Sequence, residues 1–503
     1  MSFGFLGRKL FTGIFTLALA GIPVIGIARA EGTIGPSAEP MKMGQPGGAD
    51  TSNQEILFAP PVQGQKVLTL QQLLQMASKN YPKVQQARAR LSMKRSTLWE
   101  ARTAPFTEFV LEGGLGIAPT VRGTPVLSPS SDAALTENMA LAWQMGVKGI
   151  IPLWTFGKIT NLWRLAEADI QLGRHELKKE KNEIQFEVRR AFYGLQLARD
   201  SLLLVGQALK QLAKFEAQLE EQVEEGEADE GDLFKFKMQV AELEAQQSEA
   251  RQQAAFALSG LRFFSGIDED FDIPDEPLER LPHELGPVAR YLEAARLFRP
   301  EINMARAGIA ARRAQVLIER AKYLPDFGLA LQAKMGRADE VTDQRNPYAY
   351  DRANFRSYGL GLVMRWKLDL LPQAARVAKA EAQLEEVRAI ERFAVGGVAV
   401  EVEKAWSQVK DAKTRLHAWT RATQFAKQWM ISVKNGLDLG ISEESDMVEP
   451  SKEYALKKFK ELSTVYDYNL AVARLAQATG WDGMLATSRE RESSGPTAYQ
   501  RSK

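Results

Sequence analysis

Carboxylates crowd two short stretches of this chain, each around a glycine. The first stretch, around Gly226, holds Glu224, Glu225, Glu227, Asp229, Glu230 and Asp232; the second, around Gly440, holds Asp438, Glu443, Glu444, Asp446 and Glu449. Carboxylates that line a passage favour cations, whereas carboxylates at the start of a helix stabilise its N-terminus. The residue types alone leave both interpretations open. What the carboxylates can do depends on the elements that position them.

Other chemistry is scarce in the sequence. The chain has no cysteine, which excludes disulfides, thiolate metal sites and cysteine nucleophiles. Its three histidines, His175, His283 and His417, stand far apart without metal-binding spacing. There is no phosphate-binding glycine loop or nucleophile elbow, and the formal net charge of +2 argues against a nucleic-acid partner. We therefore expect neither an enzyme nor a bound cofactor or metal.

The N-terminus has the pattern of an export signal. Arg8 and Lys9 precede an apolar stretch over residues 10–27, and residues 28–30 read Ala-Arg-Ala, which fits a cleavage site. An uncleaved anchor is the alternative, because the apolar stretch is nearly long enough to span a membrane. No later segment approaches that length without charges. Any other membrane contact must therefore be made by strands.

The chain consists of two copies of one unit. From Glu187 onward the second copy follows the first at a constant offset of 214 residues, so that Gly226 matches Gly440 and Gly266 matches Gly480. A constant offset over about eighty positions is not expected by chance. We expect a signal peptide at 1–30, a flexible linker at 31–66, a first repeat at 67–266, an inter-repeat linker at 267–290, a second repeat at 291–482 and a polar tail at 483–503.

Each repeat is expected to hold two long helices joined by a turn. Apolar residues recur in steps of three and four from Val188 to Val223, and again from Val402 to Leu437. Such a seam is typical of a coiled coil. The first long helix is expected from Lys158 to about Glu224, and at ~1.5 Å per residue it spans on the order of 100 Å, more than a globular core. The carboxylate-rich stretches are then the turns between the long helices.

Four other segments alternate between apolar and polar residues. They lie near 106–118 and 138–151 in the first repeat and near 326–336 and 356–368 in the second. A length of about ten residues with period two is typical of a tilted strand that spans an outer membrane. A half-buried strand of a soluble sheet alternates in the same way. Matching positions in two coiled-coil units behind an export signal favour the membrane.

The number of strands per chain constrains how the chain assembles. Four strands cannot close a barrel, and an open sheet edge is not tolerated in lipid. The missing strands must come from other copies of the chain, and three copies would give twelve strands, an even number within the usual range. The strand pattern requires a closed barrel, but it does not by itself set the number of copies at three. Pro119, Pro125 and Pro129 predict one loop between strands and residues 337–354 the other.

This layout resembles the TolC family of outer-membrane efflux proteins over nearly the whole chain after the signal. At the first helix the similar motif is Leu68-Thr69-Leu70 with Ala77, Asn80, Pro82 and Ala87. At the strand-to-helix junction it is Ile151-Pro152-Leu153-Trp154 with Gly157-Lys158. Two further motifs are Gly226 with Asp232-Leu233 after the long helix and Leu261 with Gly266 at the end of the unit. Each motif is weak alone. Their order and their duplication make the resemblance specific.

The resemblance implies a mainly α-helical protein with a membrane β part. The family is a homotrimer in which a 12-stranded outer-membrane β-barrel continues into a periplasmic α-barrel. The chain would then be one subunit of a passive exit duct in a tripartite efflux or type I secretion system. Its partners would be outer-membrane lipid, a periplasmic adaptor and an inner-membrane pump, with no nucleic acid.

By the same resemblance the two turns form the periplasmic tip, which is both the gate and the adaptor-docking surface. In the family an acidic pair after the second turn lines the aperture, and Asp446 and Glu449 hold the similar positions, three residues apart on one helical face. Asp232 is a third pore candidate. The docking candidates are Gly226, Glu227, Asp229, Gly440, Glu443 and Glu444. Threefold symmetry would turn each pore carboxylate into a ring that favours cations.

Two features depart from the family pattern. The first turn, residues 225–231, lacks the apolar tip motif of well-known drug-efflux members. Pro450 directly follows Glu449, where it is expected to delay or kink the start of the next helix. The adaptor and the closed-gate geometry therefore stay open, as does the cargo.

A periplasmic coiled-coil scaffold without transport activity is the alternative function. It accounts for the export signal and for the helical seams. It does not account for four amphipathic strands placed symmetrically in the two repeats.

Overall fold

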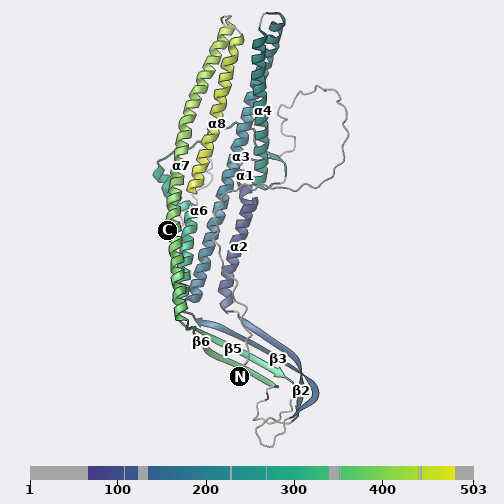
Figure 1. The fold of residues 1–503 in the computed structure, drawn as a ribbon, viewed down its shortest axis with the longest axis vertical. Coiled ribbons are helices and arrows are strands. Elements are labelled where there is room, and N and C mark those ends of the chain that lie inside the picture. The colour runs from purple at the N-terminus through teal and green to yellow at the C-terminus, as the bar shows by residue number, and fades with distance from the viewer. Residues whose placement is uncertain are drawn as a thin grey trace. The chain divides into compact units, whose positions relative to one another are not determined.

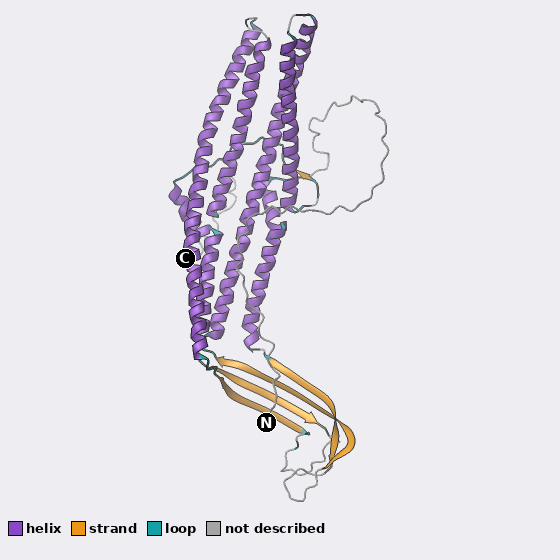
Figure 2. Cartoon of the chain, in the orientation of Figure 1, coloured by secondary structure: helices purple, strands orange, loops and turns teal. Residues whose placement is uncertain are grey.

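The computed structural model describes residues 66–481, except positions 107, 123–133, 227–228, 268, 339–350, 352, 440 and 442–443. All described residues belong to one compact unit, residues 61–503. The expected signal peptide, the N-terminal linker up to residue 65 and the polar tail lie outside the described residues. Within the unit, long helices and a sheet of four strands occupy separate regions (Figure 1 and Figure 2).

The two repeats contain the same elements in the same order. The first repeat holds α1 (Leu70–Asn80), α2 (Pro82–Thr103), β2 (Phe109–Arg122), β3 (Ala134–Trp154), α3 (Lys158–Glu224) and α4 (Glu230–Ser265). The second holds α5 (Val288–Phe298), α6 (Pro300–Ala321), β5 (Asp326–Arg337), β6 (Phe355–Arg365), α7 (Leu370–Asp438) and α8 (Val448–Thr479). Helix α3 has 67 residues and α7 has 69. The mainly helical, duplicated fold is confirmed, and so are the expected bounds of α3.

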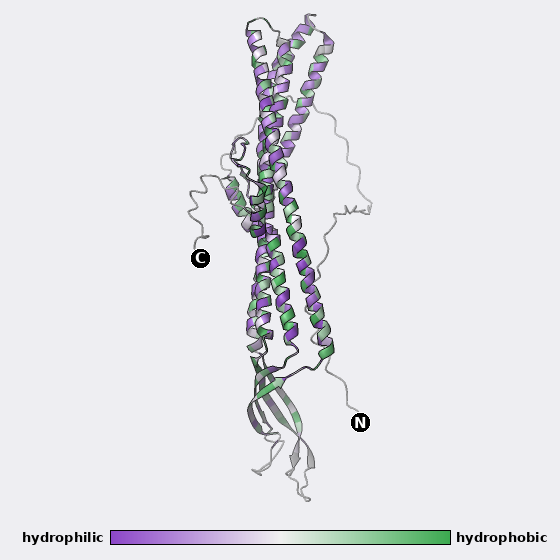
Figure 3. Cartoon of the chain, turned by 90° about the vertical axis from the view of Figure 1, so that its left-hand side faces the viewer, coloured by the Kyte–Doolittle hydropathy of each residue, from purple (hydrophilic) through white to green (hydrophobic). Residues whose placement is uncertain are grey.

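The predicted apolar seams form the helix core. Val188 on α3 and Val402 on α7 are both fully buried. Val223 and Leu437, close to the turns, are only partly buried. Near the turns, Figure 1 shows α3 beside α4 and α7 beside α8, and among the described residues the seam is less covered there than at its middle. Figure 3 shows apolar and polar residues interspersed along every long helix.

Local signals fix the ends of the helices. Thr69 and Gln72 form a capping box at the start of α1, in which each side chain bonds the other residue's backbone N–H. Pro82 and Pro300 occupy the first position of α2 and α6, where a missing N–H costs nothing. The repeats therefore share the proline start of their second helix, whereas α5, the counterpart of α1, begins after Pro287 without a side-chain cap.

The four long strands form one antiparallel sheet in the order β2-β3-β5-β6. β3 of the first repeat pairs with β5 of the second, so the two repeats meet in the middle of the sheet. The outer edges of β2 and β6 have no partner strand among the described residues. The sheet of one chain is therefore open on both sides.

The structure corrects the prediction that Pro119 lies in a loop. Pro119 lies inside β2, opposite Met139, and a register shift follows between Pro119 and Val121. A proline lacks the N–H that a strand donates, and it is tolerated at an edge strand or a bulge. Pro125 and Pro129 lie outside the described residues.

Side chains tie the sheet to the helices. The ammonium of Lys158, at the start of α3, bonds the Asp326 carboxylate at 2.7 Å and the Leu324 carbonyl at 2.8 Å. At the junction of β6 and α7, a hydrogen bond from Arg376 and a second from Lys367 lower the pKa of Asp369 to about 2. Because α3 belongs to the first repeat and β5 to the second, the Lys158 contacts also hold the repeats together where strands become helices.

Residues 269–287 of the inter-repeat linker form an ordered segment, the strap, that crosses both hairpins. Its short strand β4 (Phe271–Asp272) pairs in parallel with β1 (Lys66–Val67). Asp200 on α3 accepts the Leu278 N–H at 2.9 Å, and burial raises the pKa of Asp200. On α8, Asn469 bonds the Leu281 N–H and the Glu279 carbonyl. The strap thereby fixes the two hairpins relative to each other midway along their length.

Candidate functional site

The first turn reverses the chain between α3 and α4. Gly226 has φ +77°, a left-handed conformation that favours glycine, and its N–H bonds the Val223 carbonyl at 3.1 Å. Asp229 then caps α4, accepting the Gly231 N–H on its carboxylate. For Asp229 the helix-cap interpretation is therefore confirmed. Glu227 lies outside the described residues, and Asp232 is placed in α4 by its backbone.

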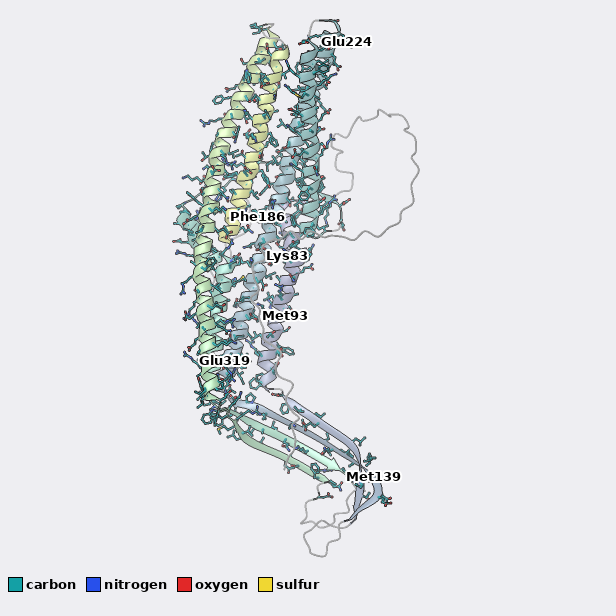
Figure 4. All side chains as sticks on the ribbon, viewed as in Figure 1. Lys83, Met93, Met139, Phe186, Glu224 and Glu319 are labelled. Atoms are coloured by element: carbon teal, nitrogen blue, oxygen red, sulfur yellow. The ribbon has the colours of Figure 1, made fainter. Side chains whose placement is uncertain are left out.

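The carboxylates at the end of α3 cannot be explained as helix caps. Glu221, Glu224 and Glu225 are exposed at the C-terminus of α3, the end of a helix that disfavours negative charge. Figure 4 places Glu224 at the opposite end of the molecule from Met139 in β3. Nearby, the Lys237 ammonium bonds Glu220 at 2.7 Å, and that hydrogen bond raises the pKa of Lys237. A surplus of carboxylates is left facing solvent at this turn.

The second turn joins α7 to α8 through a short 3-10 helix, η2 (Glu444–Met447). Asp446 lies in η2 and Glu449 in the first turn of α8, and both side chains are exposed. Asp446 is thus on a 3-10 helix and not, as expected, on the α-helix that carries Glu449. Gly440 and Glu443 lie outside the described residues, and Glu444 is placed by its backbone alone.

Pro450 has the effect that was expected of it. At the offset of 214 residues, the first residue of α4, Glu230, matches Glu444, yet α8 begins only at Val448. The four intervening residues form η2. Pro450 occupies the third position of α8, where its missing N–H has no helical partner to lose. The proline thus delays the helix without breaking it.

The structure adds two residues that the sequence analysis did not single out. Leu439 and Ile441 flank Gly440, and their exposed fractions are 74% and 79%. The first turn carries acids at the matching positions, Glu225 and Glu227. Apolar residues inside a predicted turn were the available signal. The two turns therefore present different surfaces, one acidic and one with an apolar tip.

Both turns lie at the end of the helices that is remote from the sheet (Figure 1). Asp232 belongs to the first hairpin, whereas Asp446 and Glu449 belong to the second. Helix α3 connects the hairpins, since it packs against α4, α6 and α8. In the part of the turns that the structure describes, one chain supplies two acidic tips on different hairpins and no enclosed site around them.

The remaining candidates for chemistry are dispersed. His283 lies in the strap, where its Nε2 is 3.1 Å from the Tyr291 hydroxyl, while His175 and His417 lie on long helices. Among the described residues, no three histidine or carboxylate side chains are grouped so that they could hold a metal ion. Among the helices that the structure describes, none combines the length and hydrophobicity of a membrane-spanning helix.

Comparison with known protein families shows to which family the chain belongs. Residues 73–266 and 291–481 each match the model of the outer membrane efflux protein family. The chain belongs to that family. Each matched range lies within one of the two repeats described above, and together they cover more than half of the chain. The expected membership of the TolC family is confirmed.

Individual relatives agree with this assignment. The chain is 23% identical to protein CyaE of Bordetella pertussis over 372 residues, which is 72% of this chain and 73% of CyaE. Its fold is similar to the CmeC outer membrane channel of Campylobacter jejuni, with a TM-score of 0.65 at 14% identity, covering 82% of this chain and 85% of CmeC. It is equally similar to the MtrE outer membrane channel of Neisseria gonorrhoeae, with a TM-score of 0.66 at 14% identity and coverage of 82% and 88%.

The protein is therefore an outer-membrane efflux channel that extends into the periplasm. It is a transport protein and not an enzyme. The strands form its membrane part, and the long helices with their two acidic tips form its periplasmic part. The scaffold interpretation, which had no role for the strands, is set aside.

Proposed function

We propose that three copies of this channel close a 12-stranded barrel and continue into one periplasmic helical tunnel. The tunnel is a passive exit duct that is gated at the helix tips. It receives its cargo from an inner-membrane pump through a periplasmic adaptor that docks on the tips.

The open sheet is the observation that carries this proposal. One chain contributes four strands with two unpaired edges, and unpaired backbone groups are not tolerated in lipid. One face of the sheet is apolar and exposed: Leu115, Leu360 and Tyr358 have exposed fractions of 74%, 70% and 91%. Lipid would cover this face, and neighbouring copies would pair the edges. Three copies supply twelve strands.

Exposed aromatic side chains on the helices support the same assembly. Four of the most exposed lie on the two helices at the flanks of the chain: Phe234 and Phe256 on α4, Phe393 and Phe425 on α7. Contact with a neighbouring copy would remove these aromatic side chains from water. In a closed ring, α4 of one copy would pack against α7 of the next.

The tips supply the gate. Asp446 and Glu449 are exposed in consecutive helical turns at the free end of the second hairpin, and three copies would bring them together as rings that favour cations. Asp232 would add a further ring from the first hairpin. The closed state would bring these rings to the narrowest part of the tunnel.

The same tips supply the docking surface. Its candidate residues are Gly226, Glu227 and Asp229 in the first turn, and Gly440, Glu443 and Glu444 in the second, which are close in sequence to the exposed Leu439 and Ile441. An adaptor with apolar contacts for the second turn and basic residues for the first would fit both.

The assembly is tested by measuring the mass of the detergent-solubilised protein together with its conductance in planar bilayers. We expect the mass of a trimer and a small, cation-selective conductance, because the closed tips hold the carboxylate rings. The trimer should also move faster on a gel when it is not heated. A monomer, or a soluble dimer that never inserts, would contradict the proposal.

Docking is tested by combining Leu439→Asp with Ile441→Asp. We expect the variant to assemble and conduct like the wild type but to lose adaptor binding in a cross-linking assay, because two apolar contacts become charges. Met93→Asp is the control: Met93 is an exposed apolar residue on α2, far from the turns (Figure 4). Unchanged cross-linking of the double variant would remove the second turn from the docking surface.

A further inference from the structure

Near the middle of the strands, one face of the membrane sheet carries charged residues in two adjacent rows. The strand register aligns Glu112, Gly146, Lys334 and Ser357 in one row. It aligns Val110, Lys148, Gln332 and Gly359 in the next row on the same face. Between these two rows, on the other face, lies the apolar row Leu111, Val147, Ala333 and Tyr358. The sheet thus has a charged face and a lipid-compatible face.

The charged side chains of these rows interact with one another. The Lys148 ammonium donates to a carboxylate oxygen of Glu112. Lys334 acts electrostatically on the same carboxylate from the opposite side of Gly146. A Cβ at Gly146 would lie 3.0 Å from the Lys334 Cγ, so the glycine makes room for the lysine stem. Glycine here allows Glu112 and Lys334 to lie on one level, with Lys148 in the next row of the same face.

The cluster has more positive than negative charge. Lys148 is paired with Glu112, whereas Lys334 is exposed and makes no ion pair within 4.0 Å among the described residues. At the helix end of the same face, Asp326 lies directly opposite Arg365, and its carboxylate bonds Lys158. At the middle of the strands, Glu112, Lys148 and Lys334 together leave one unbalanced positive charge per chain.

We propose that Lys334, together with the Lys148–Glu112 pair, forms a positive collar around the lumen of the barrel and favours anions there. This proposal rests on the proposed trimeric barrel, in which the charged face lines the lumen and the apolar face contacts lipid. Rings of lysine favour anions just as rings of carboxylate favour cations. The duct then has two charge filters of opposite sign, carboxylates at the periplasmic tip and lysines in the membrane section. Cargo with acidic groups is attracted into the exit section.

The test is the reversal potential of single channels in a salt gradient, measured with Lys334→Gln and Lys334→Glu. We expect both variants to shift the reversal potential toward cation selectivity, and the glutamate variant by about twice as much, because it changes the charge by two units. The shift should grow at low salt, since the screening length rises from about 8 Å at 0.15 M to about 30 Å at 0.01 M.

Arg356→Gln is the matched control. Arg356 pairs in register with Met335 on the apolar face, next to Ser357 in sequence. The substitution removes the same charge from the same region but from the other face. It should leave the reversal potential unchanged.

A chemical probe checks which face lines the lumen. Because the chain has no cysteine, Lys334→Cys and Leu360→Cys each introduce a single thiol. A charged, water-soluble thiol reagent should modify the first in the assembled trimer and spare the second.

Conducting Lys334 variants with an unchanged reversal potential at low salt would overturn the collar, as would a Lys334→Cys thiol that the reagent does not reach. A wild-type protein that neither trimerises nor conducts would overturn the proposed function instead.

Discussion

Gly480→Ala is expected to prevent the channel from folding stably, the largest effect of any single substitution considered. Gly480 ends α8 in the left-handed conformation, with φ +66°. An added Cβ would lie 2.7 Å from the carbonyl oxygen and 2.9 Å from the carbonyl carbon of Phe298, both backbone atoms at the end of α5. Left-handed strain of about 1–2 kcal/mol and overpacking of about 1–3 kcal/mol together give a loss of about 2–5 kcal/mol.

Two other glycines provide graded controls for this prediction. Gly226 has φ +77° but nothing within 4 Å of an added Cβ, so Gly226→Ala should cost only the left-handed strain of about 1–2 kcal/mol. Gly266, which matches Gly480 in the first repeat, would contact the Asn80 Cβ at 3.0 Å and should be intermediate. The measurement is thermal unfolding followed by circular dichroism and by trimer mobility on unheated gels. Equal losses for Gly226→Ala and Gly480→Ala would contradict the packing argument.

Removing Asp446 and Glu449 together is expected to relieve block of the channel by multivalent cations. In a trimer, Asp446→Ala with Glu449→Ala deletes two carboxylate rings, so a blocking ion loses several attractive contacts at once. A loss of about 1.4 kcal/mol in binding raises the half-blocking concentration tenfold, and we expect an increase of about tenfold or more. The measurement is titration of a trivalent cation from the periplasmic side of single channels.

The control for the gate removes the same number of carboxylates elsewhere. Glu385→Ala with Glu386→Ala does so at exposed positions on α7, far from the turns. This variant should be blocked like the wild type. If the tip variant is blocked at the wild-type concentration while it conducts normally, Asp446 and Glu449 do not line the aperture.

The elements of this fold were predictable because their signals are local. The steps of three and four around Val188 and Val402 reflect the helical period, and both residues are buried in the structure. The alternation along β3 and β5 reflects the strand period in the same way. Duplication strengthened each prediction, because a weak pattern in one repeat could be checked at the matching residues of the other.

The position of the candidate site in the chain was predictable, but the local structure and exposure of its residues were not. The glycines at 226 and 440 predicted two turns, and the structure ends α3 and α7 just before them and continues with α4 and α8. It did not follow from the sequence that Asp229 would be a helix cap, that Asp446 would lie on a 3-10 helix, or that Leu439 and Ile441 would be exposed. These outcomes depend on where each helix starts relative to the helix it packs against. Residues that are close in sequence do not determine that position.

By itself, the sequence of this channel determined its duplication, its long helices, its four strands and the two acidic turns. Tertiary structure decided the rest, because the deciding contacts join residues that are distant in the chain. Pro119 became part of a strand because Met139 pairs with it. The strap became ordered because Asp200 and Asn469, on different repeats, bond its backbone. The charged level at Lys334 exists only because three strands align Glu112, Gly146 and Lys334 in one row.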